Sequence, residues 1–198
     1  MNPPLLIVLT GKTASGKDTI KSALLRKYPN LKKVITTTSR VPRTGEKDGV
    51  DYHFLKREQF EDRIRENAFA EYVEYGGNFY GTAKIELEQA LESDTLWKID
   101  PSRAGEVRDF INRSYTGEKA QQLIKRVLVI YINTSDDVVL ERLKRRSLSN
   151  LEIQKRMSDD TKIWQQYKDK YDFVIENISG QLDQTIHKVC NIIDRSKI

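Results

Sequence analysis

Short apolar runs alternate along the chain with stretches of helical periodicity. The runs lie at residues 5–9, 34–36, 96–99, 127–132 and 173–176 and are rich in valine, isoleucine and leucine. Because polar residues hardly interrupt them, the runs are typical of strands that are buried on both faces of a parallel sheet. Strands that alternate with helices predict an α/β fold, in which helices connect the parallel strands.

Helices are expected between and after these strands. The pattern places them at residues 17–28, 102–113, 135–147, about 150–169 and near the C-terminus. Ser149 and Glu152 have the spacing of a capping box, which begins the long fourth helix. In the last helix Leu182, Ile186, Val189 and Ile193 share one face, which core packing explains. We expect an exposed loop at residues 114–119.

Residues from about 36 to 93 break this rhythm. They combine alternating aromatic positions, such as Tyr52 and Phe54, with glycine-rich turns and short helical stretches. This stretch therefore looks like an insertion into the α/β domain. The chain of 198 residues has room for one domain, which we expect to span residues 1–198 with its core at 1–35, 94–137 and 170–198.

The composition narrows the class of protein. Hydrophobic residues make up 38% of the chain and charged residues 32%, and the apolar runs are too short to cross a bilayer. The N-terminus lacks the basic segment of a secretory signal, so the cytoplasm is the expected location and no membrane partner is expected. The single cysteine, Cys190, excludes an intrachain disulfide, and its place in an apolar helical stripe favours a core position.

The net charge of +5 fits either a nucleic-acid binder or a protein that gathers several phosphate groups. Two widely separated groups of arginines, Arg40 with Arg43 and the group from Arg142 to Arg156, favour the second reading. The sequence has no basic run interleaved with stacking aromatic residues. We therefore expect two anion sites and no nucleic-acid partner.

Residues 11–17 fit the phosphate-loop pattern G-x-x-x-x-G-K and lie between a predicted strand and a predicted helix. The glycines let successive N–H groups turn toward a phosphate, the helix N-terminus adds its dipole, and the lysine bridges the β- and γ-phosphates. The loop predicts ATP binding by Gly11, Lys12, Thr13, Ala14, Ser15, Gly16, Lys17, Asp18 and Thr19.

One position departs from the loop pattern, which has serine or threonine after the lysine as a Mg²⁺ ligand. This chain has Asp18 there, followed by Thr19. A carboxylate is a hard oxygen ligand that suits Mg²⁺. We therefore expect Asp18 to hold the metal directly or through water.

Several spaced motifs follow the loop. They are TTTSRVPRTGE at residues 36–46, GVDYHF at 49–54, EY at 71–72, GNFYGT at 77–82 and YDFVIEN at 171–177. Together with the phosphate loop they resemble the guanylate kinase family over nearly the whole chain. The resemblance implies a P-loop three-layer fold with a parallel central sheet flanked by helices, a GMP-binding subdomain inserted at about 36–93, and a helical lid at about 138–169.

The resemblance also implies the acceptor site. In that family two arginines and two tyrosines hold the acceptor phosphate, which suits the geometry of guanidinium forks. A carboxylate, here Glu71, reads the base, because it can accept from N1–H and N2–H₂ of guanine together, whereas adenine has an acceptor at N1. The expected GMP-binding residues are Thr36, Arg40, Arg43, Glu46, Tyr52, Glu71, Tyr80, Gly81, Thr82 and Asp100, among which Arg40, Arg43, Tyr52 and Tyr80 hold the phosphate.

A second arginine-rich stretch, residues 142–156, resembles the lid of these kinases. Arg146 and Arg156 match the phosphate-contacting arginines of the lid best, at an interval one residue shorter than the usual one. Arginines that a closing lid brings in stabilise the charge of the transferring phosphoryl group. The resemblance implies that Lys17, Arg43, Arg146 and Arg156 are catalytic and that Arg142 contacts ATP.

The segment after the predicted strand at 96–99 departs from the family a second time. Lys98 stands where the family usually has an aspartate near the metal, and the family's D-x-Q-G becomes Asp100-Pro101-Ser102-Arg103. Asp100 stays at the mouth of the sheet, where α/β proteins place ligands, and is expected in the metal site with Asp18. Because Asp18 adds a carboxylate where Lys98 removes one, we expect the two changes to compensate and the Lys98 amine to lie near Asp18 or the phosphates.

These features predict a Mg²⁺-dependent kinase that transfers the γ-phosphate of ATP to GMP, or to dGMP, and is a monomer or homodimer. Two alternatives stay open. A P-loop kinase of another acceptor, such as ribose 1,5-bisphosphate or another nucleoside monophosphate, would share the Gly-Lys-Asp loop. A non-catalytic guanylate-kinase-like module that binds phosphopeptides would typically lack the phosphate loop that is present here.

Overall fold

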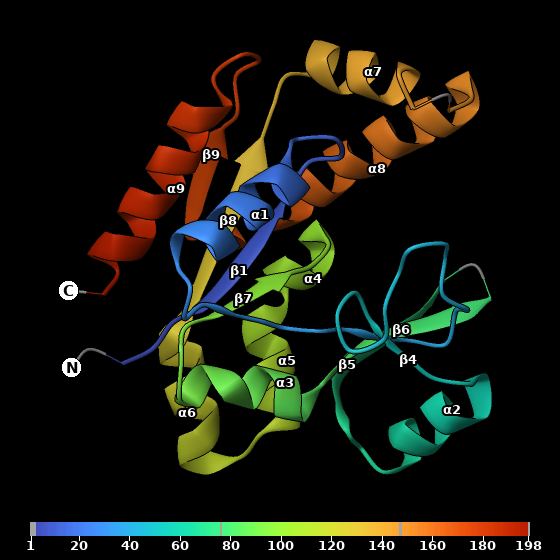
Figure 1. Ribbon diagram of the computed structural model, residues 1–198, viewed down its shortest axis with the longest axis vertical. Coiled ribbons are helices and arrows are strands. Elements are labelled where there is room, and N and C mark those ends of the chain that lie inside the picture. The colour runs from blue at the N-terminus through green and yellow to red at the C-terminus, as the bar shows by residue number, and fades with distance from the viewer. Residues whose placement is uncertain (1–2, 76, 147, 198) are drawn as a thin grey trace.

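Two separate sheets organise the molecule (Figure 1). The computed structural model describes residues 3–75, 77–146 and 148–197. The larger sheet has five strands in the order β2-β7-β1-β8-β9, and the smaller has four in the order β4-β3-β6-β5. Among the described residues no helix is both long enough and apolar enough to span a membrane.

The larger sheet is parallel throughout, which confirms the predicted α/β fold. Its strands are β1 (Leu6–Gly11), β2 (Lys32–Lys33), β7 (Thr95–Lys98), β8 (Val127–Asn133) and β9 (Phe173–Glu176). Strand β1 lies at the centre between β7 and β8, and all six of its residues are buried. Side chains alternate across a strand, so β1 supplies apolar groups to both faces of the sheet.

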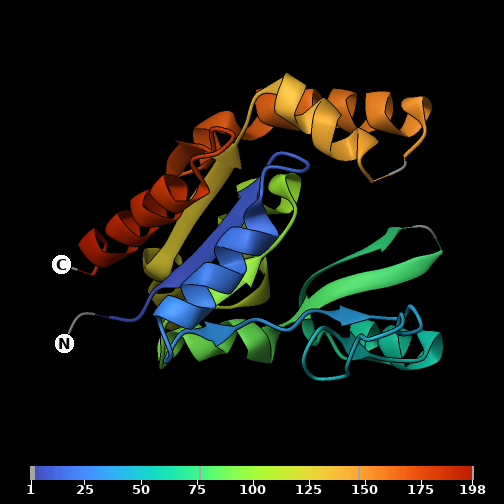
Figure 2. The same ribbon diagram turned by 45° about the horizontal axis from the view of Figure 1, so that its top comes forward.

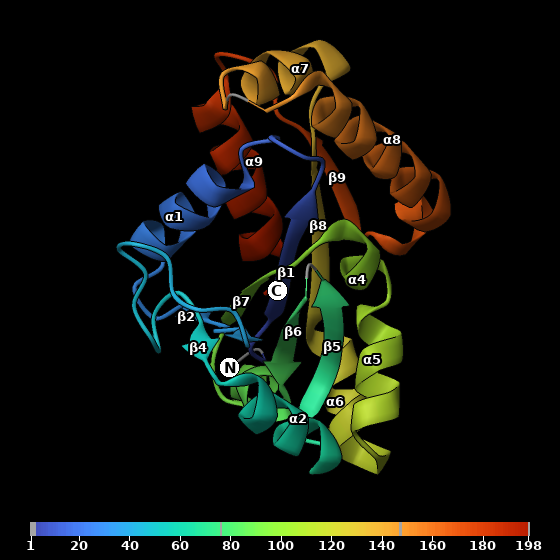
Figure 3. The same ribbon diagram turned by 90° about the vertical axis from the view of Figure 1, so that its right-hand side faces the viewer.

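Helices cover both faces of this sheet (Figure 3). On one face Ile7 and Leu9 pack with α1 (Lys17–Lys27) and α9 (Leu182–Arg195), where Cys190 is buried as expected. On the other face Leu6 and Val8 pack with α4 (Pro101–Gly105), α5 (Val107–Ser114) and α6 (Gly117–Arg126). The three layers leave the carboxyl ends of β1 and β7 open for a site.

The smaller sheet and one helix form a small lobe, residues 37–83, beside the core (Figure 2). The lobe consists of β3 (Thr37–Thr38), β4 (His53–Phe54), α2 (Arg57–Arg65), β5 (Phe69–Tyr75) and β6 (Asn78–Ala83). Its own core contains the stacked rings of Phe60, Phe69 and Phe79, with centroids 4.3 and 5.2 Å from the Phe60 centroid. Helix α3 (Lys84–Glu88) and the 3₁₀ turn η1 (Gln89–Leu91) lead back to β7.

A pair of helices, α7 (Asp136–Lys144) and α8 (Asn150–Tyr167), extends from the end of β8 at the top of Figure 1. Val139, Leu143 and Ile153 pack between the two helices. The capping box predicted at Ser149 and Glu152 is confirmed, since the Ser149 hydroxyl accepts the Glu152 N–H and the Glu152 carboxylate accepts the Ser149 N–H. The 3₁₀ turn η2 (Lys168–Lys170) leads from α8 toward β9.

One strand prediction was wrong, and for a second strand the expected burial was wrong. The run at 34–36 is not a strand: β2 comes before it, and after the Val34 N–H bonds the Leu96 carbonyl the chain leaves the large sheet for β3. The run at 173–176 is a strand, but it is not buried on both faces. Because β9 is an edge strand, Phe173 and Val174 remain 41% and 47% exposed.

The region after β7 also differs from its prediction. The single helix expected at 102–113 is two helices, α4 and α5, with Glu106 between them in a non-helical conformation. The loop expected at 114–119 is confined to Tyr115 and Thr116, because α6 begins at Gly117 and buries Ala120 and Leu123. These residues extend the cover of the sheet. The division into core, insertion and lid stays a prediction.

Candidate active site

The phosphate loop leaves β1 through a close backbone approach. Gly11 has φ +144°, and a Cβ on it would lie 2.1 Å from the Ile132 carbonyl oxygen of β8, a distance that no side chain tolerates. The next residue fixes the exit, since the Lys12 N–H donates to the same carbonyl at 3.0 Å. At the other end of the loop Gly16 has φ +93° and directly precedes α1. Only glycine fits both positions without strain.

Side chains from distant elements hold the loop in place. The Asn177 amide after β9 donates to the Ser15 carbonyl at 2.7 Å, and Asn177 itself accepts the Thr185 hydroxyl at 3.0 Å. From α7, the Arg142 guanidinium donates to the Ala14 carbonyl at 2.8 Å. From α8, the buried Asp160 carboxylate accepts the Thr13 N–H at 2.9 Å. The helical pair thus contacts the phosphate loop directly.

The Lys17 amine lies inside the loop that precedes it. It donates to the Gly11 and Lys12 carbonyls, each at 2.6 Å. Burial lowers the pKa of Lys17 to about 8, and the nearby Asp160 carboxylate opposes this shift. The positive charges of Lys98 and Arg146 lower it further. The amine is poised to exchange these carbonyl contacts for a phosphate.

Asp18 and Lys98 form a pair at the mouth of the sheet. The Lys98 amine donates to Asp18 Oδ1 at 2.7 Å, so it lies where the sequence argument required. Hydrogen bonding and charge from Lys98 lower the pKa of the Asp18 carboxyl, outweighing the opposing effect of its partial burial. The Asp18 side chain is still 73% exposed, so it is accessible to a cation beside the loop.

A cavity of about 710 Å³ lies between the phosphate loop and the small lobe. Its lining joins three parts of the chain. Gly11, Thr13, Lys17 and Asp160 come from the loop and α8; Thr36, Tyr52, Glu71, Val73, Tyr80 and Gly81 come from the small lobe and its entry; Lys98, Ile99, Asp100, Pro101, Ser102 and Arg103 follow from the end of β7. The cavity therefore brings part of the predicted ATP set, namely Gly11, Thr13 and Lys17, together with part of the predicted GMP set, namely Thr36, Tyr52, Glu71, Tyr80, Gly81 and Asp100.

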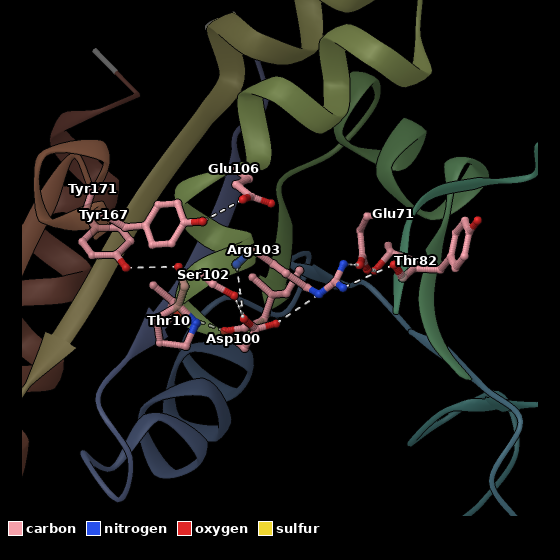
Figure 4. Close-up of polar contacts among 12 residues, drawn as sticks. Thr10, Glu71, Thr82, Asp100, Ser102, Arg103, Glu106, Tyr167 and Tyr171 are labelled. Atoms are coloured by element: carbon pink, nitrogen blue, oxygen red, sulfur yellow. Dashed lines mark hydrogen bonds and ion pairs between the residues drawn. The ribbon is translucent and has the colours of Figure 1, made fainter. Parts of the chain in front are cut away.

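A buried carboxylate lies at the small-lobe side of this cavity (Figure 4). The Glu71 side chain is only 5% exposed. Its Oε1 accepts the Thr82 hydroxyl at 2.7 Å, and its Oε2 accepts from the Arg103 guanidinium. Burial raises the pKa of Glu71, although Arg103 and Thr82 act in the opposite direction.

The other predicted base-site residues lie close by. Asp100 caps α4, since its Oδ1 accepts the Arg103 N–H at 3.2 Å and the Ser102 hydroxyl at 2.6 Å. Thr36 lines the cavity, and its carbonyl accepts the His53 N–H of β4 at 2.9 Å. The contacts with α4 hold the Asp100 carboxylate in place, and the hydrogen bond from β4 holds the backbone of Thr36.

The predicted phosphate ligands are arranged around two tyrosine rings. Tyr52 and Tyr80 line the cavity with their centroids 6.5 Å apart, and the Arg40 guanidinium lies 5.5 Å from the Tyr52 centroid. Arg40 binds both oxygens of Glu46 at 2.9 Å, and the Arg43 backbone N–H donates to Glu46 at 2.7 Å. Glu46 therefore organises the arginine segment rather than facing this cavity.

All three arginines that were predicted as catalytic lie outside the cavity lining. Among the described residues that line it, none is Arg43, Arg146 or Arg156, and all three side chains are exposed. Arg146 nevertheless lies close enough to Lys17 to lower its pKa by charge repulsion. Thr19 is exposed on α1.

Sequence reasoning did not single out Arg103, Asp160 or the loop-holding role of Asn177. Arg103 had a signal, because it lies in the altered D-x-Q-G stretch. Asp160 had none, since its partner Thr13 lies 147 positions earlier in the chain. Asn177 belonged to a recognised motif, but its contact with Ser15 spans 162 positions.

Comparisons with known proteins identify the family of the chain. A family model described as guanylate kinase matches residues 4–196. The chain is 33% identical to a guanylate kinase of Desulfitobacterium hafniense (strain Y51), over 89% of this chain and 83% of the relative. It is 30% identical to a guanylate kinase of Rickettsia felis, over 97% of this chain and 94% of the relative.

Solved structures give the same picture. The crystal structure of guanylate kinase from Anaplasma phagocytophilum is similar with a TM-score of 0.71 and 25% identity, over 100% of this chain and 88% of that one. A shikimate kinase from Acinetobacter baumannii, with a TM-score of 0.53 and 14% identity, shares the fold alone. The family match over nearly all residues, together with the two curated relatives, confirms the resemblance seen in the motifs: the chain belongs to the guanylate kinase family.

Proposed function

We propose that the chain transfers the γ-phosphate of ATP to GMP and releases ADP and GDP. One observation carries the proposal: a single cavity is lined both by the phosphate-loop lysine, Lys17, and by a buried carboxylate, Glu71. A P-loop amine suits the β- and γ-phosphates of ATP. A carboxylate that faces the cavity suits a base with two adjacent N–H donors.

Guanine fits the Glu71 end of the cavity better than adenine does. N1–H and N2–H₂ of guanine can donate together to the carboxylate, which has four acceptor sites on its two oxygens. Thr82 and Arg103 each use one of these sites, so acceptor sites remain on both oxygens. Adenine would bring its N1 acceptor toward the carboxylate, and two acceptors facing each other leave both unpaired.

The acceptor phosphate is assigned to the tyrosine pair and the arginine segment. We assign Tyr52 and Tyr80 as hydroxyl donors, with Arg40 and Arg43 as the guanidinium ligands. Support comes from the positions of both tyrosines in the cavity lining and of Arg40 against the Tyr52 ring. Glu46 holds Arg40 in a bidentate pair, which orders an otherwise long and flexible side chain.

The transferring phosphate is assigned to Lys17 and the arginines of the helical pair. Phosphoryl transfer needs positioning and charge stabilisation more than covalent chemistry. Arg142 already contacts the loop, and Arg146 lies within electrostatic reach of Lys17. We assign Arg146 and Arg156 to the transition state, where a closing movement of α7 and α8 would deliver them.

The residues beside the loop fit Mg²⁺ as the metal that accompanies ATP. Mg²⁺ takes one or two carboxylates together with substrate phosphates, and the exposed Asp18 carboxylate lies at the start of α1 beside the loop. Both oxygens of Asp100 face groups of α4, so the proposal rests mainly on Asp18, with Asp100 as a water-mediated ligand. When bound, Mg²⁺ would neutralise charge on the β- and γ-phosphates.

Both alternative functions are less well supported. A different acceptor, such as ribose 1,5-bisphosphate, gives the buried Glu71 and Thr82 pair no partner. A non-catalytic module would have no use for the glycines with positive φ at 11 and 16. Every residue of the proposed site comes from one chain, so the proposal does not require a homodimer.

A coupled assay of ADP release tests the proposal with the purified chain, ATP and Mg²⁺. GMP, dGMP, AMP, UMP and ribose 1,5-bisphosphate serve as acceptors. We expect kcat/KM for GMP to exceed that for AMP by about tenfold or more, the loss expected when polar groups are left unpaired. A higher rate with ribose bisphosphate, or no ADP release with any nucleotide, would contradict the proposed function.

A further inference from the structure

An arginine from the core reaches the carboxylate of the small lobe (Figure 4). Arg103 lies on α4, and its guanidinium bonds Oε2 of Glu71 on β5 and also the Tyr72 carbonyl, at 3.3 Å. Arg103 stands at the glycine position of the family's D-x-Q-G stretch.

Glu71 needs a partner for its charge. Its side chain is 95% buried, as the 5% exposure shows, and an unpaired buried carboxylate is costly and tends to take up a proton. Burial raises the pKa of Glu71, and the positive charge of Arg103 is the largest opposing influence. A protonated Glu71 would lose acceptor capacity and would no longer suit both N–H donors of guanine.

Arg103 is itself held firmly on the core. Its Nε lies 3.5 Å from Asp100 Oδ2, and its guanidinium lies 5.9 Å from the centroid of the Phe110 ring on α5. The side chain is 18% exposed. Because the Arg103 guanidinium is held in place, it can orient the Glu71 carboxylate that it binds.

We propose that Arg103 is a positioning residue for base recognition, which keeps Glu71 ionised and aimed into the cavity and ties β5 of the small lobe to α4 of the core. The inference rests on the proposed role of Glu71 in binding GMP. Arg103 acts through Glu71 and leaves acceptor sites on both carboxylate oxygens for the base.

Substitutions of Arg103 test this role by steady-state kinetics from about pH 5.5 to about pH 8.5. In R103Q we expect the KM for GMP at neutral pH to rise about tenfold or more and to fall again as the pH rises, because Glu71 then loses its proton. The KM for ATP should change less than about twofold. R103K keeps the charge without the fork and should restore part of the GMP affinity and the flatter pH profile.

R113Q is the matched control, because Arg113 stacks on the same Phe110 ring at 5.1 Å but from the exposed surface of α5. It should leave the KM for GMP and its pH profile as in the wild type. If R103Q does not fold, R103M, which keeps a long unbranched side chain without the charge, carries the same prediction. R103Q and R103M both remove the positive charge at position 103.

E71Q separates the two proposals. If the wild type does not phosphorylate GMP, the proposed function fails. If the wild type does phosphorylate GMP but E71Q leaves the KM for GMP unchanged, the assignment of Glu71 to the base fails, and the role of Arg103 fails with it. If E71Q raises that KM while R103Q leaves the KM and its pH profile unchanged, the role of Arg103 is overturned. A lower KM for GMP in R103Q would also overturn it, because Arg103 would then compete with the base for Glu71.

Discussion

Burial of the Lys17 amine among the carbonyls of its own loop brings its titration close to neutral pH. The pKa of about 8 means that the free enzyme carries a charged Lys17 below pH 8 and a largely neutral one above it. ATP needs the charged form. We therefore expect kcat/KM for ATP, at saturating GMP, to fall as the pH rises through about 8, by up to about tenfold per pH unit.

The control for Lys17 is K17R, whose guanidinium stays charged throughout this range. K17R should be less active but should lose the inflection near pH 8. A wild-type profile that is flat up to about pH 9.5, or an inflection that persists in K17R, would show that Lys17 does not titrate as described.

A second prediction at the residue scale concerns Asp18. If Asp18 helps to hold Mg²⁺, D18A should raise the Mg²⁺ concentration for half-maximal activity by about tenfold, a loss typical of residues that support a bound metal. D18S supplies the hydroxyl that the loop pattern has at this position and should recover part of the Mg²⁺ affinity. An unchanged Mg²⁺ dependence in D18A would remove Asp18 from the metal site.

At the scale of elements, α4 and α8 pack so closely at Gly105 that no side chain fits between them. A Cβ on Gly105 would lie 2.4 Å from the Tyr167 ring, whose hydroxyl donates to Glu106 at 2.7 Å. Glycine is needed here for space, since α4 ends against this ring. We expect G105A to lower the free energy of unfolding by about 1–3 kcal/mol, as overpacking does, measured by denaturant titration.

A second variant isolates the cause of the Gly105 effect. In a Tyr167→Ala background the ring is absent, so G105A should cost much less than in the wild type. An equal cost in both backgrounds would mean that the ring is not the reason for the glycine.

The elements that sequence patterns predicted well are those with local signals. The phosphate loop was located because its glycines, its lysine and its flanking strand and helix are adjacent in sequence. The capping box at Ser149 was found for the same reason. The run at 34–36 was wrongly predicted as a strand because its residues have strand propensity. In the structure only the Val34 N–H bonds the large sheet, at the Leu96 carbonyl, and the chain then leaves for the small sheet.

Long-range contacts explain what the sequence could not reveal about the site. Glu71 was named from its motif, but its pairing with Arg103 depends on how the small lobe sits against α4. Asp160 reaches the loop from α8, a helix assigned to the lid from its arginines, with no local signal that marks the aspartate. Exposure of Phe173 and Val174 follows from the edge position of β9, which no local pattern records.

At the scale of the whole molecule, the cavity lies where three parts meet. The core supplies the loop and the end of β7, the small lobe supplies Glu71 and the tyrosines, and α8 supplies Asp160. The Arg103–Glu71 pair joins the small lobe to the core, while Arg142 and Asp160 join the helical pair to the loop. Substrates that occupy the cavity would therefore contact all three parts at once.

The most direct test of the account compares E71Q with the wild type in the ADP-release assay, with GMP and ATP varied in turn. Each hydrogen bond to a charged carboxylate contributes about 1.5–3 kcal/mol. The account predicts that E71Q raises the KM for GMP by about tenfold or more and changes the KM for ATP by less than about twofold. Equal effects on both nucleotides, or an unchanged KM for GMP, would contradict the reading of guanine by Glu71.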